Sequence, residues 1–143
     1  MDPRFEITFE ESPTDADVAI LGSGLKLHSG KIFGGMWVKD LTFFLRDDSG
    51  AVRGGVFGNC GSFGWLYVDT LYVEEELRGN GYGEKLMSMI ETDAANRGCR
   101  FAYLNTFTFQ APNFYEKLDY REFARLDDFP PGHSRVFLRK DIR

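Results

Sequence analysis

Residues 71–86 read LYVEEELRGNGYGEKL, and this stretch decides the fold. An apolar strand ends in an acidic turn, and three glycines at alternate positions, Gly79, Gly81 and Gly83, then open an amphipathic helix. Because glycine lacks a Cβ, its backbone reaches positive φ and neighbouring N–H groups can point into one concavity. Those N–H groups stand at a helix N-terminus, where free donors and the macrodipole favour an anion. The stretch predicts a phosphate-binding loop at the end of a strand.

The spacing of the glycines separates this loop from two other phosphate-binding loops. The dinucleotide fingerprint G-x-G-x-x-G would need a glycine at Glu84 or at Leu86. The ATP-type sequence G-x-x-x-x-G-K-[ST] does not occur in the chain. The pattern present, Arg78-x-x-Gly81-x-Gly83 between a strand and a helix, resembles the acyl-CoA pyrophosphate loop of the GNAT (Gcn5-related) N-acetyltransferases. The alternative is a glycine-rich turn that only joins a strand to a helix.

Length, charge and cysteine content limit the class of protein. A chain of 143 residues has the length of one domain, and we expect a single N-acetyltransferase domain over residues 1–143. The net charge of −5 argues against a nucleic-acid partner and weakly favours cationic substrates such as amines. No apolar run reaches membrane-spanning length and residues 1–4 begin no signal peptide, so we expect a cytoplasmic protein without a membrane partner. Cys60 and Cys99 have neither metal-ligand nor disulfide spacing, so reduced thiols and no metal are expected.

The first half of the chain contains patterns of strands and of one weak helix. Strict alternation predicts a half-buried strand at residues 5–9, and capping residues at 12–16 begin a helix that Gly22 and Gly24 weaken. Residues 29–35 are expected to form a mobile loop. Strands 40–46 and 52–58 form a hairpin around the turn 47–50, and Gly54-Gly55 indicates a bulge or a close backbone approach.

The second half alternates strands and helices. We expect a strand at 65–73, a helix from Tyr82 to Gly98, a strand at 101–109, a short helix at 113–118, and strands at 122–126 and 135–139. The apolar face expected for the long helix consists of Leu86, Met89, Ile90 and Ala94. This order is α+β and is not the βαβαβ run of a doubly wound nucleotide fold. It also resembles the GNAT fold, which implies a central mixed, mostly antiparallel sheet flanked by helices, with a splayed cofactor-binding strand.

A third motif lies at residues 111–120, which read APNFYEKLDY. Pro112 suits the first position of a helix, where its missing N–H costs nothing. The segment is similar to the GNAT pattern A-x-x-F-Y-x-x-x-G-[FY], which implies that Tyr115 lies near the thioester sulfur and that Asn113 contacts the cofactor. Asp119 stands where the family has Gly, a position with a left-handed backbone, which Asp tolerates better than most residues. An ordinary half-buried helix tyrosine is the alternative for Tyr115.

The resemblance implies a mechanism by direct attack of an amine on acetyl-CoA. Acetyl transfer needs a deprotonated amine, a polarised carbonyl and a protonated thiolate, and Tyr115 is the expected general acid. Main-chain groups of residues 71–73 are expected to hold the thioester and pantetheine, and those of residues 78–83 the pyrophosphate. The implied cofactor-binding residues are Leu71, Tyr72, Val73, Arg78, Gly79, Asn80, Gly81, Tyr82, Gly83 and Asn113.

The residues leave the general base open. Asp69 on the central strand, His133 in the turn at 130–133 and, less favoured, His28 in the N-terminal segment are the candidates, and a water chain could replace them all. Each has a structural alternative, as a hydrogen-bond acceptor for Asp69 and as a solvated loop residue for either histidine. Residues 74–76, three glutamates in a row, are interpreted as a solvated turn with favourable charge near a helix start.

Aromatic residues gather before the cofactor strand, and aromatics on strands usually belong to the core. The alternative is that they line a pocket for an apolar or aromatic amine. Core positions are expected for most of Phe43, Phe44, Phe57 and Phe63, whereas Trp37, Trp65 and Tyr67 are the candidates to line such a pocket.

Two classes of function stay open at this point. The first is an N-acetyltransferase that acts on a primary amine of a small molecule or peptide, and Tyr115 favours it. The second is a non-catalytic acyl-CoA-binding module, a sensor or partner domain without a base. A homodimer is left open as a further partnership, and the patterns do not indicate which amine is the substrate.

Overall fold

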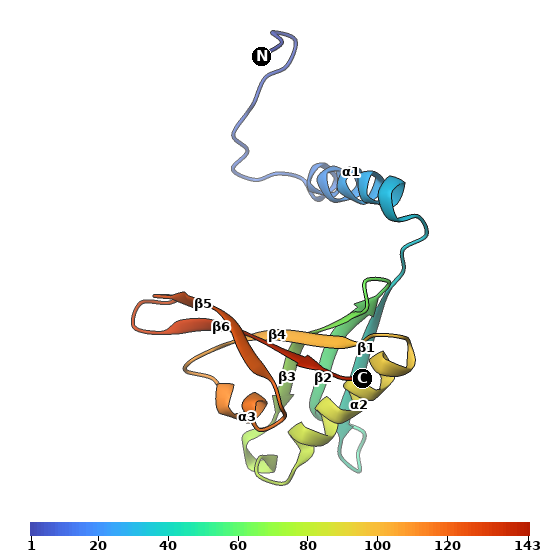
Figure 1. Cartoon of the computed structure of the whole chain (residues 1–143). Coiled ribbons are helices and arrows are strands. Elements are labelled where there is room, and N and C mark those ends of the chain that lie inside the picture. Colours follow the sequence, from blue (N-terminus) through green and yellow to red (C-terminus); the bar gives the residue numbers. More distant parts are fainter. The chain divides into compact units, whose positions relative to one another are not determined.

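The computed structural model describes residues 1–143 and divides them into two compact units, Met1–Met36 and Trp37–Arg143. The expectation that residues 1–143 form one N-acetyltransferase domain stays a prediction. The elements are labelled in Figure 1: α1 (Asp15–Phe33), β1 (Val38–Arg46), β2 (Val52–Gly61), β3 (Trp65–Val73), the 3₁₀ turn η1 (Glu75–Leu77), α2 (Tyr82–Asn96), β4 (Phe101–Phe107), α3 (Pro112–Glu116), β5 (Arg121–Asp127) and β6 (Ser134–Asp141).

The first unit differs from expectation at two places. Helix α1 begins after Thr14, whose Oγ1 accepts the N–H of Asp17 at 3.1 Å, and it continues to Phe33. The loop expected at 29–35 is therefore wrong, because residues 29–33 are helical. Residues 5–9 form no strand and their apolar side chains are exposed. That prediction is wrong because alternation supplies an apolar face but not the neighbouring strand that completes a ladder.

The second unit is built on one six-stranded sheet with the order β1-β2-β3-β4-β6-β5. Every neighbouring pair is antiparallel except β3 and β4, which run parallel. The prediction of an α+β fold around a mixed, mostly antiparallel sheet is thus confirmed. Strand β2 continues to Gly61, three residues beyond its expected end, because it stays paired with β1 and β3.

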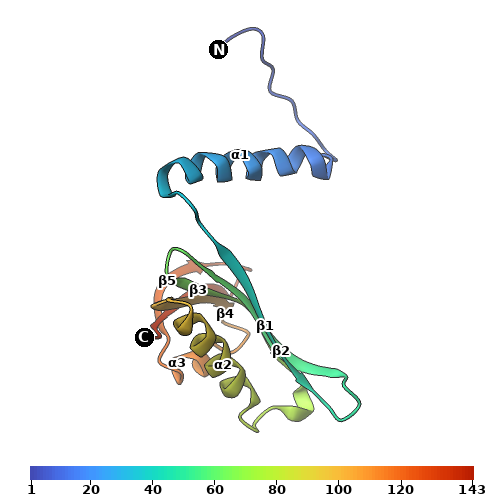
Figure 2. The ribbon, with the colours of Figure 1, turned by 90° about the vertical axis from the view of Figure 1, so that its right-hand side faces the viewer.

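Helix α2 packs across β1, β2 and β3 and forms the core with them (Figure 2). Its buried face consists of Leu86, Met87, Ile90 and Ala94. Met87 takes the place expected for Met89, which is 40% exposed. Positions 86, 90 and 94 form a stripe along α2, and the buried face can extend from this stripe toward position 87 or toward position 89. The side on which the sheet lies decides that Met87 is buried.

Two glycines let the first three strands approach closely. A Cβ on Gly54 would lie 2.7 Å from the carbonyl oxygen of Tyr72, and one on Gly55 would lie 2.7 Å from that of Phe43. The close backbone approach expected here is confirmed. A register shift also lies next to this pair, because Arg53, directly before Gly54, is the extra residue between Gly54↔Leu45 and Val52↔Arg46. The second shift lies between Phe57 and Gly58 of β2.

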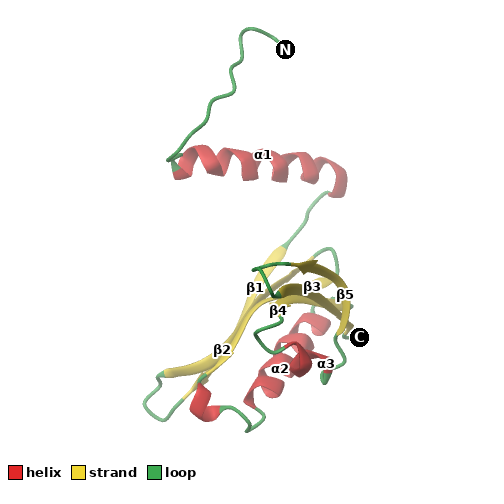
Figure 3. Ribbon diagram, turned by 90° about the vertical axis from the view of Figure 1, so that its left-hand side faces the viewer, coloured by secondary structure: helices red, strands yellow, loops and turns green.

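The short helix α3 lies on the same side of the sheet as α2 (Figure 3). Phe114, Tyr115 and Leu118 pack against the core that α2 forms with the sheet. None of the helices combines the length and the hydrophobicity that crossing a bilayer would require.

Candidate functional site

Strands β3 and β4 part after a short parallel ladder. Residues 65–67 pair with 101–103, and β3 then runs on to Val73 with a partner only on the side of β2. The splayed strand expected from the sequence is therefore present. Main-chain groups on the open edge of β3 have no strand partner.

A β-bulge lies where the two strands part. The register with β2 passes from Gly58↔Val68 to Phe57↔Thr70, so Asp69 is the extra residue of β3. Bulges bend a strand and re-aim its side chains. Asp69 is exposed, takes part in no ion pair, and its Oδ1 accepts the hydroxyl of Thr70 at 2.7 Å. The bulge thus places a carboxylate without an ion-pair partner at the point where β3 and β4 part.

The direction of the main-chain groups on β3 follows from one hydrogen bond. The N–H of Glu74 donates to the carbonyl of Arg53 at 3.0 Å, which makes these two residues a hydrogen-bonded pair. Because such pairs alternate along an antiparallel ladder, the groups of Tyr72 face β2, and those of Leu71 and Val73 face the gap beside β4. Three residues are expected to bind the thioester arm through their main chain. In Tyr72 the main-chain N–H and C=O point toward β2 and away from the gap, so they cannot bind it.

The glycine loop (residues 78–83) joins β3 and η1 to α2. Gly79 and Gly81 have φ of 75° and 83°, as their spacing predicts, and Gly81 is the N-cap of α2. Gly83 has no positive φ. Its role is steric, because a Cβ there would lie 3.1 Å from Cζ of Phe114. Two of the glycines shape the loop, and the third lets α3 approach α2.

The glycine loop presents unpaired donors at the start of α2. The N–H groups of residues 79–84 donate to no protein acceptor, and the first bond of the helix runs from Lys85 N to Gly81 O at 3.0 Å. The N–H of Arg78, by contrast, donates to Glu75 O at 3.2 Å. Free donors at a helix N-terminus favour an anion, so the loop fits a phosphate group.

Two side chains brace the glycine loop against its surroundings. Arg78 Nε donates to the carbonyl of Val73 at 2.8 Å, which leaves the terminal guanidinium nitrogens of Arg78 for another partner. Asn80 Nδ2 donates to the carbonyls of Leu77 and Arg78 at 3.0 and 3.1 Å. Tyr82, the first residue of α2, is exposed.

Tyr115 lies in α3 between two other aromatic rings. Its ring makes edge-to-face contacts with Phe114 and Tyr120, with centroids 5.1 and 6.0 Å away. The hydroxyl makes no hydrogen bond to another protein group, and burial raises the pKa of Tyr115 above its ordinary value. Tyr115 therefore keeps its proton at neutral pH and can donate it. Asn113, at the exposed start of α3, makes no side-chain hydrogen bond.

The end of α3 is anchored by a network that the sequence patterns did not reveal. Asp119 has φ 70°, the left-handed backbone expected at this position. Next to it, the buried Tyr120 donates its N–H to the carbonyl of Tyr115 at 3.1 Å and its hydroxyl to Glu91 Oε1 at 2.9 Å. Glu91 Oε2 accepts Lys140 Nζ at 2.8 Å. No spacing signal links these residues, because they come from α2, β6 and the end of α3.

The other two base candidates lie on elements other than β3. His133 is exposed in the turn between β5 and β6, and its ring packs edge-on against Phe109, with centroids 5.1 Å apart. His28 lies in α1, in the other unit. No group of three His, Cys, Asp or Glu side chains is arranged to hold a metal ion, and both cysteines are free and buried.

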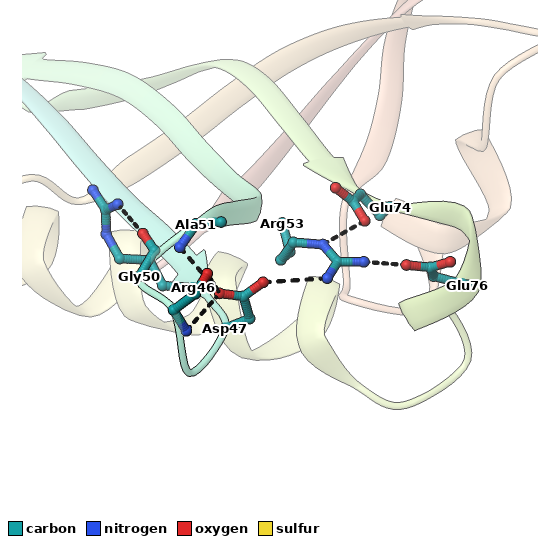
Figure 4. Close-up of polar contacts among 8 residues, drawn as sticks. Arg46, Asp47, Gly50, Ala51, Arg53, Glu74 and Glu76 are labelled. Atoms are coloured by element: carbon teal, nitrogen blue, oxygen red, sulfur yellow. Dashed lines mark hydrogen bonds and ion pairs between the residues drawn. The ribbon is translucent and has the colours of Figure 1, made fainter.

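The acidic turn before the glycine loop is only partly solvated. Arg53 donates through Nε to Glu74 Oε2 at 2.6 Å, through Nη2 to Glu76 Oε1, and through Nη1 to Asp47 Oδ2 at 3.3 Å (Figure 4). The interpretation as a solvated turn is confirmed for Glu75 and for Glu76, whose side chain is 68% exposed, and is wrong only for Glu74, which is half-buried against Arg53. These contacts tie the hairpin turn and η1 to β2.

The aromatic residues of positions 37–67 are distributed differently than expected. Trp65 stacks on Phe101 and Tyr67 packs on Tyr103, at 4.7 and 4.9 Å between centroids, while Trp37 is exposed. Phe43 packs against the core, but the other three phenylalanines expected there do not: Phe44, Phe57 and Phe63 are exposed. Successive residues of a strand point to opposite faces, and α2 covers only one face of this sheet.

Phe44 and Phe57 border a hollow of about 220 Å³ on the face of β1–β3 opposite α2. The sequence patterns did not indicate this hollow, because it depends on which residues of three strands come side by side. We call it the aromatic hollow, and its central residues are Thr42, Phe44, Gly55, Phe57, Thr70 and Tyr72.

Comparison with known proteins agrees with this geometry. Residues 39–122 match the acetyltransferase (GNAT) domain family. The chain is 37% identical over 108 residues to acetyltransferase Atu2258 of Agrobacterium fabrum, covering 76% of this chain and 78% of that protein. It is 36% identical over 96 residues to a blasticidin-S acetyltransferase of Streptomyces morookaense, covering 66% and 70%. The crystal structure of an acetyltransferase from Bacillus cereus superposes with a TM-score of 0.84 at 32% identity, covering 94% and 97%.

Proposed function

Because the chain belongs to the GNAT family of acetyltransferases, we propose that it transfers the acetyl group of acetyl-CoA to a primary amine of a small molecule. The chain is an acetyltransferase, so the alternative of a non-catalytic acyl-CoA-binding module is set aside. One observation carries the assignment of the cofactor site: main-chain groups without a protein partner occur both on the open edge of β3 and, from residue 79 to 84, at the start of α2.

The two sets of main-chain groups suit two parts of acetyl-CoA. Leu71, whose N–H and C=O face the gap, is proposed to bind the thioester carbonyl and the pantetheine amide, together with the N–H of Val73. The N–H groups of residues 79–84 and the free nitrogens of Arg78 are proposed to bind the pyrophosphate. The main-chain N–H and C=O of Tyr72 face β2, so Tyr72 is proposed to contact acetyl-CoA through its side chain only.

Acetyl-CoA supplies an activated thioester carbonyl, to which the amine nitrogen bonds as the carbon–sulfur bond breaks. The N–H of Leu71 would stabilise negative charge on the carbonyl oxygen. Tyr115, held protonated by burial, would donate its hydroxyl proton to the departing thiolate. Asp69, at the bulge where the strands part, would accept the proton that the amine loses, directly or through water. His133 stays the second candidate for this role.

The choice of a small-molecule amine rests on similarity. One relative is named for an acetyltransferase reaction on blasticidin S, which is a small-molecule substrate. A peptide amine stays the alternative, and a homodimer and a cytoplasmic location stay predictions.

A thiol-release assay tests the proposed function. Purified protein is mixed with acetyl-CoA and a panel of primary amines, and free CoA is measured against a control without amine. We expect amine-dependent release of CoA together with an N-acetylated product in the mass spectrum. Tight binding of CoA without turnover on any amine would contradict the proposal and support an acyl-CoA-binding module.

A further inference from the structure

We propose that Tyr120 is a positioning residue for the acetyl-transfer step, held by Glu91 and Lys140 so that it fixes the ring of Tyr115. This inference rests on the proposed function, because it takes Tyr115 as the general acid and adds the group that places it. Tyr120 is assigned no contact with acetyl-CoA or the amine and acts only through Tyr115.

The short helix that carries Tyr115 depends on support from its surroundings. Helix α3 spans five residues, Pro112–Glu116, and no side chain caps its N-terminus. A helix of this length does not hold its shape in water by itself. The Tyr115 hydroxyl makes no hydrogen bond to a protein group. The position of its ring therefore depends on the helix and on the rings of Phe114 and Tyr120 beside it.

Tyr120 closes the C-terminal end of α3 through its main chain. The N–H of Tyr120 donates to the carbonyl of Tyr115 at 3.1 Å, and the N–H of Asp119 donates to that of Glu116 at 3.1 Å. With the left-handed backbone of Asp119 (φ 70°), these two bonds form a Schellman motif, in which a side-chain contact often joins the residues at its two ends. Here these residues are Tyr115 and Tyr120, whose rings meet edge to face with centroids 6.0 Å apart. A shift of Tyr120 therefore moves Tyr115 through both the main chain and the ring.

The side chain of Tyr120 is tied to two further elements. Its hydroxyl donates to Glu91 Oε1 of α2 at 2.9 Å, and Glu91 Oε2 accepts Lys140 Nζ of β6 at 2.8 Å. Lys140 Nζ also lies 5.5 Å from the centroid of the Tyr120 ring, so each of the three side chains contacts the other two. Burial of Tyr120, which is 3% exposed, and the carboxylate of Glu91 raise the pKa of Tyr120 above its ordinary value. The hydroxyl thus keeps its proton and stays the donor.

A polar network at this place supplies a direction that apolar packing does not. Apolar groups in place of a buried ion pair are often equally stable, so stability alone does not require these three side chains. Hydrophobic contact is non-directional, whereas hydrogen bonds to a carboxylate fix both distance and angle. A general acid must come within roughly 2.6–3.2 Å of the atom that it protonates. A displacement of about 1 Å can cost ~10²-fold in rate, and Tyr115 depends on the network for placement within this tolerance.

A double-mutant cycle on Tyr115 and Tyr120 tests the inference, with the amine that gives the fastest CoA release in the panel. Tyr120→Phe keeps the ring contact and deletes only the bond to Glu91. We expect it to lower kcat about five- to tenfold, with the KM values of acetyl-CoA and amine within about twofold. In protein that already carries Tyr115→Phe, the same change should lower kcat less than about twofold, because no acid remains to be positioned.

Tyr103→Phe is the matched control for this cycle. It removes the hydroxyl of another half-buried tyrosine, which lies on β4, and kcat should stay within about twofold in both backgrounds.

A stability-matched variant separates placement from folding. The triple change Tyr120→Phe, Glu91→Met and Lys140→Met replaces the polar network by apolar side chains, and its melting temperature should lie within about 5 °C of the wild-type value. Its kcat should stay as low as that of Tyr120→Phe, because the packing is restored and the directed contacts are not. The acetyl-CoA Kd should stay close to the wild-type value in every variant. The cycle decides alone if the triple variant does not fold.

The other outcomes count against the inference in distinct ways. Equal fold losses from Tyr120→Phe in the two backgrounds, or wild-type kcat in Tyr120→Phe or in the triple variant, would overturn it and leave the proposed function standing. A rise in the KM of acetyl-CoA without loss of kcat would make Tyr120 a support of the cofactor site and overturn it as well. If Tyr115→Phe alone leaves kcat unchanged, the proposed acid is wrong and the inference falls with it. Absence of amine-dependent CoA release in the wild-type protein would contradict the proposed function and with it the inference.

Discussion

The phenyl ring of Phe114 occupies the space that a side chain at Gly83 would need. A Cβ on Gly83 would lie 3.1 Å from Cζ and 3.4 Å from Cε2 of this ring. The contact joins the glycine loop, which we propose to bind the pyrophosphate, to α3, which carries the proposed acid Tyr115. Two motifs separated by some thirty positions in the sequence thus share one packing contact. Changes at Gly83 should therefore affect both cofactor binding and proton transfer.

Gly81→Val should raise the acetyl-CoA Kd at least tenfold, which corresponds to about 1.4 kcal/mol. Gly81 has φ 83°, and a β-branched residue resists that conformation, so the N–H groups of the glycine loop would lose their arrangement. Isothermal titration calorimetry measures the change. Gly50→Val is the control, because Gly50 has φ 84° and an equally open surrounding in the hairpin turn, outside the glycine loop. Unchanged binding in folded Gly81→Val would mean that the loop is only a turn.

Gly83→Val should weaken acetyl-CoA binding at least tenfold and lower kcat as well, because the added side chain displaces Phe114 and with it α3. Steady-state kinetics and calorimetry on the same variant separate the two effects. Adding Phe114→Ala to Gly83→Val should restore part of the binding, since the smaller side chain makes room. If the double variant binds no better than Gly83→Val, displacement of Phe114 is not the cause.

Tyr115→Phe should lower kcat at least tenfold and leave acetyl-CoA binding nearly unchanged. The change keeps the ring contacts with Phe114 and Tyr120 but deletes the proton donor, and general acid catalysis commonly contributes ~10²–10⁴-fold. A loss confined to kcat marks an interaction made mainly in the transition state. Tyr103→Phe serves as the control. It also removes a tyrosine hydroxyl, from the residue of β4 that forms the last pair of the short β3–β4 ladder. A change in binding alone would make Tyr115 a cofactor contact, and no change would make it a packing residue.

CoA should raise the melting temperature at concentrations at which NAD and ATP do not. A ligand that binds only the folded state stabilises it by mass action, and the spacing of the glycines departs from both nucleotide fingerprints. Differential scanning fluorimetry with the three nucleotides at equal concentration gives the comparison. A larger shift with NAD or ATP would contradict the assignment of the loop to acyl-CoA.

Lys140→Met should lower the free energy of unfolding by about 2–4 kcal/mol. The side chains of Glu91 and Lys140 are 12% and 20% exposed, so removal of the cation leaves a largely buried carboxylate without its partner. Urea denaturation monitored by circular dichroism measures the loss, and the double change Glu91→Met with Lys140→Met should recover part of it. Arg97→Met, which breaks the more exposed Arg97–Asp93 pair, should cost less than about 1 kcal/mol. Equal losses would mean that the buried network does not anchor α3.

The segment from β3 to α2 was predictable from the sequence because its signals are local. The strand at 65–73 has the predicted bounds, and α2 begins at the predicted Tyr82. The positive φ of Gly81 and of Asp119 also follows from residue type and position within a few neighbours. Such features depend on the chain's own backbone and on hydrogen bonds a few residues long. The resemblance to the GNAT motifs rests on the same segments, and the family is confirmed.

Features that need a distant partner were decided by the tertiary structure. Residues 5–9 alternate like a strand but have no ladder, and Met87 instead of Met89 is buried because of the side on which the sheet lies. The pairing of Arg53 with Glu74 and Glu76, the network around Tyr120, and the aromatic hollow each bring together residues from separate elements. A sequence pattern specifies which face of an element is apolar, but burial, ion pairing and the shape of a cavity depend on what covers that face. Only the packed sheet supplies that partner.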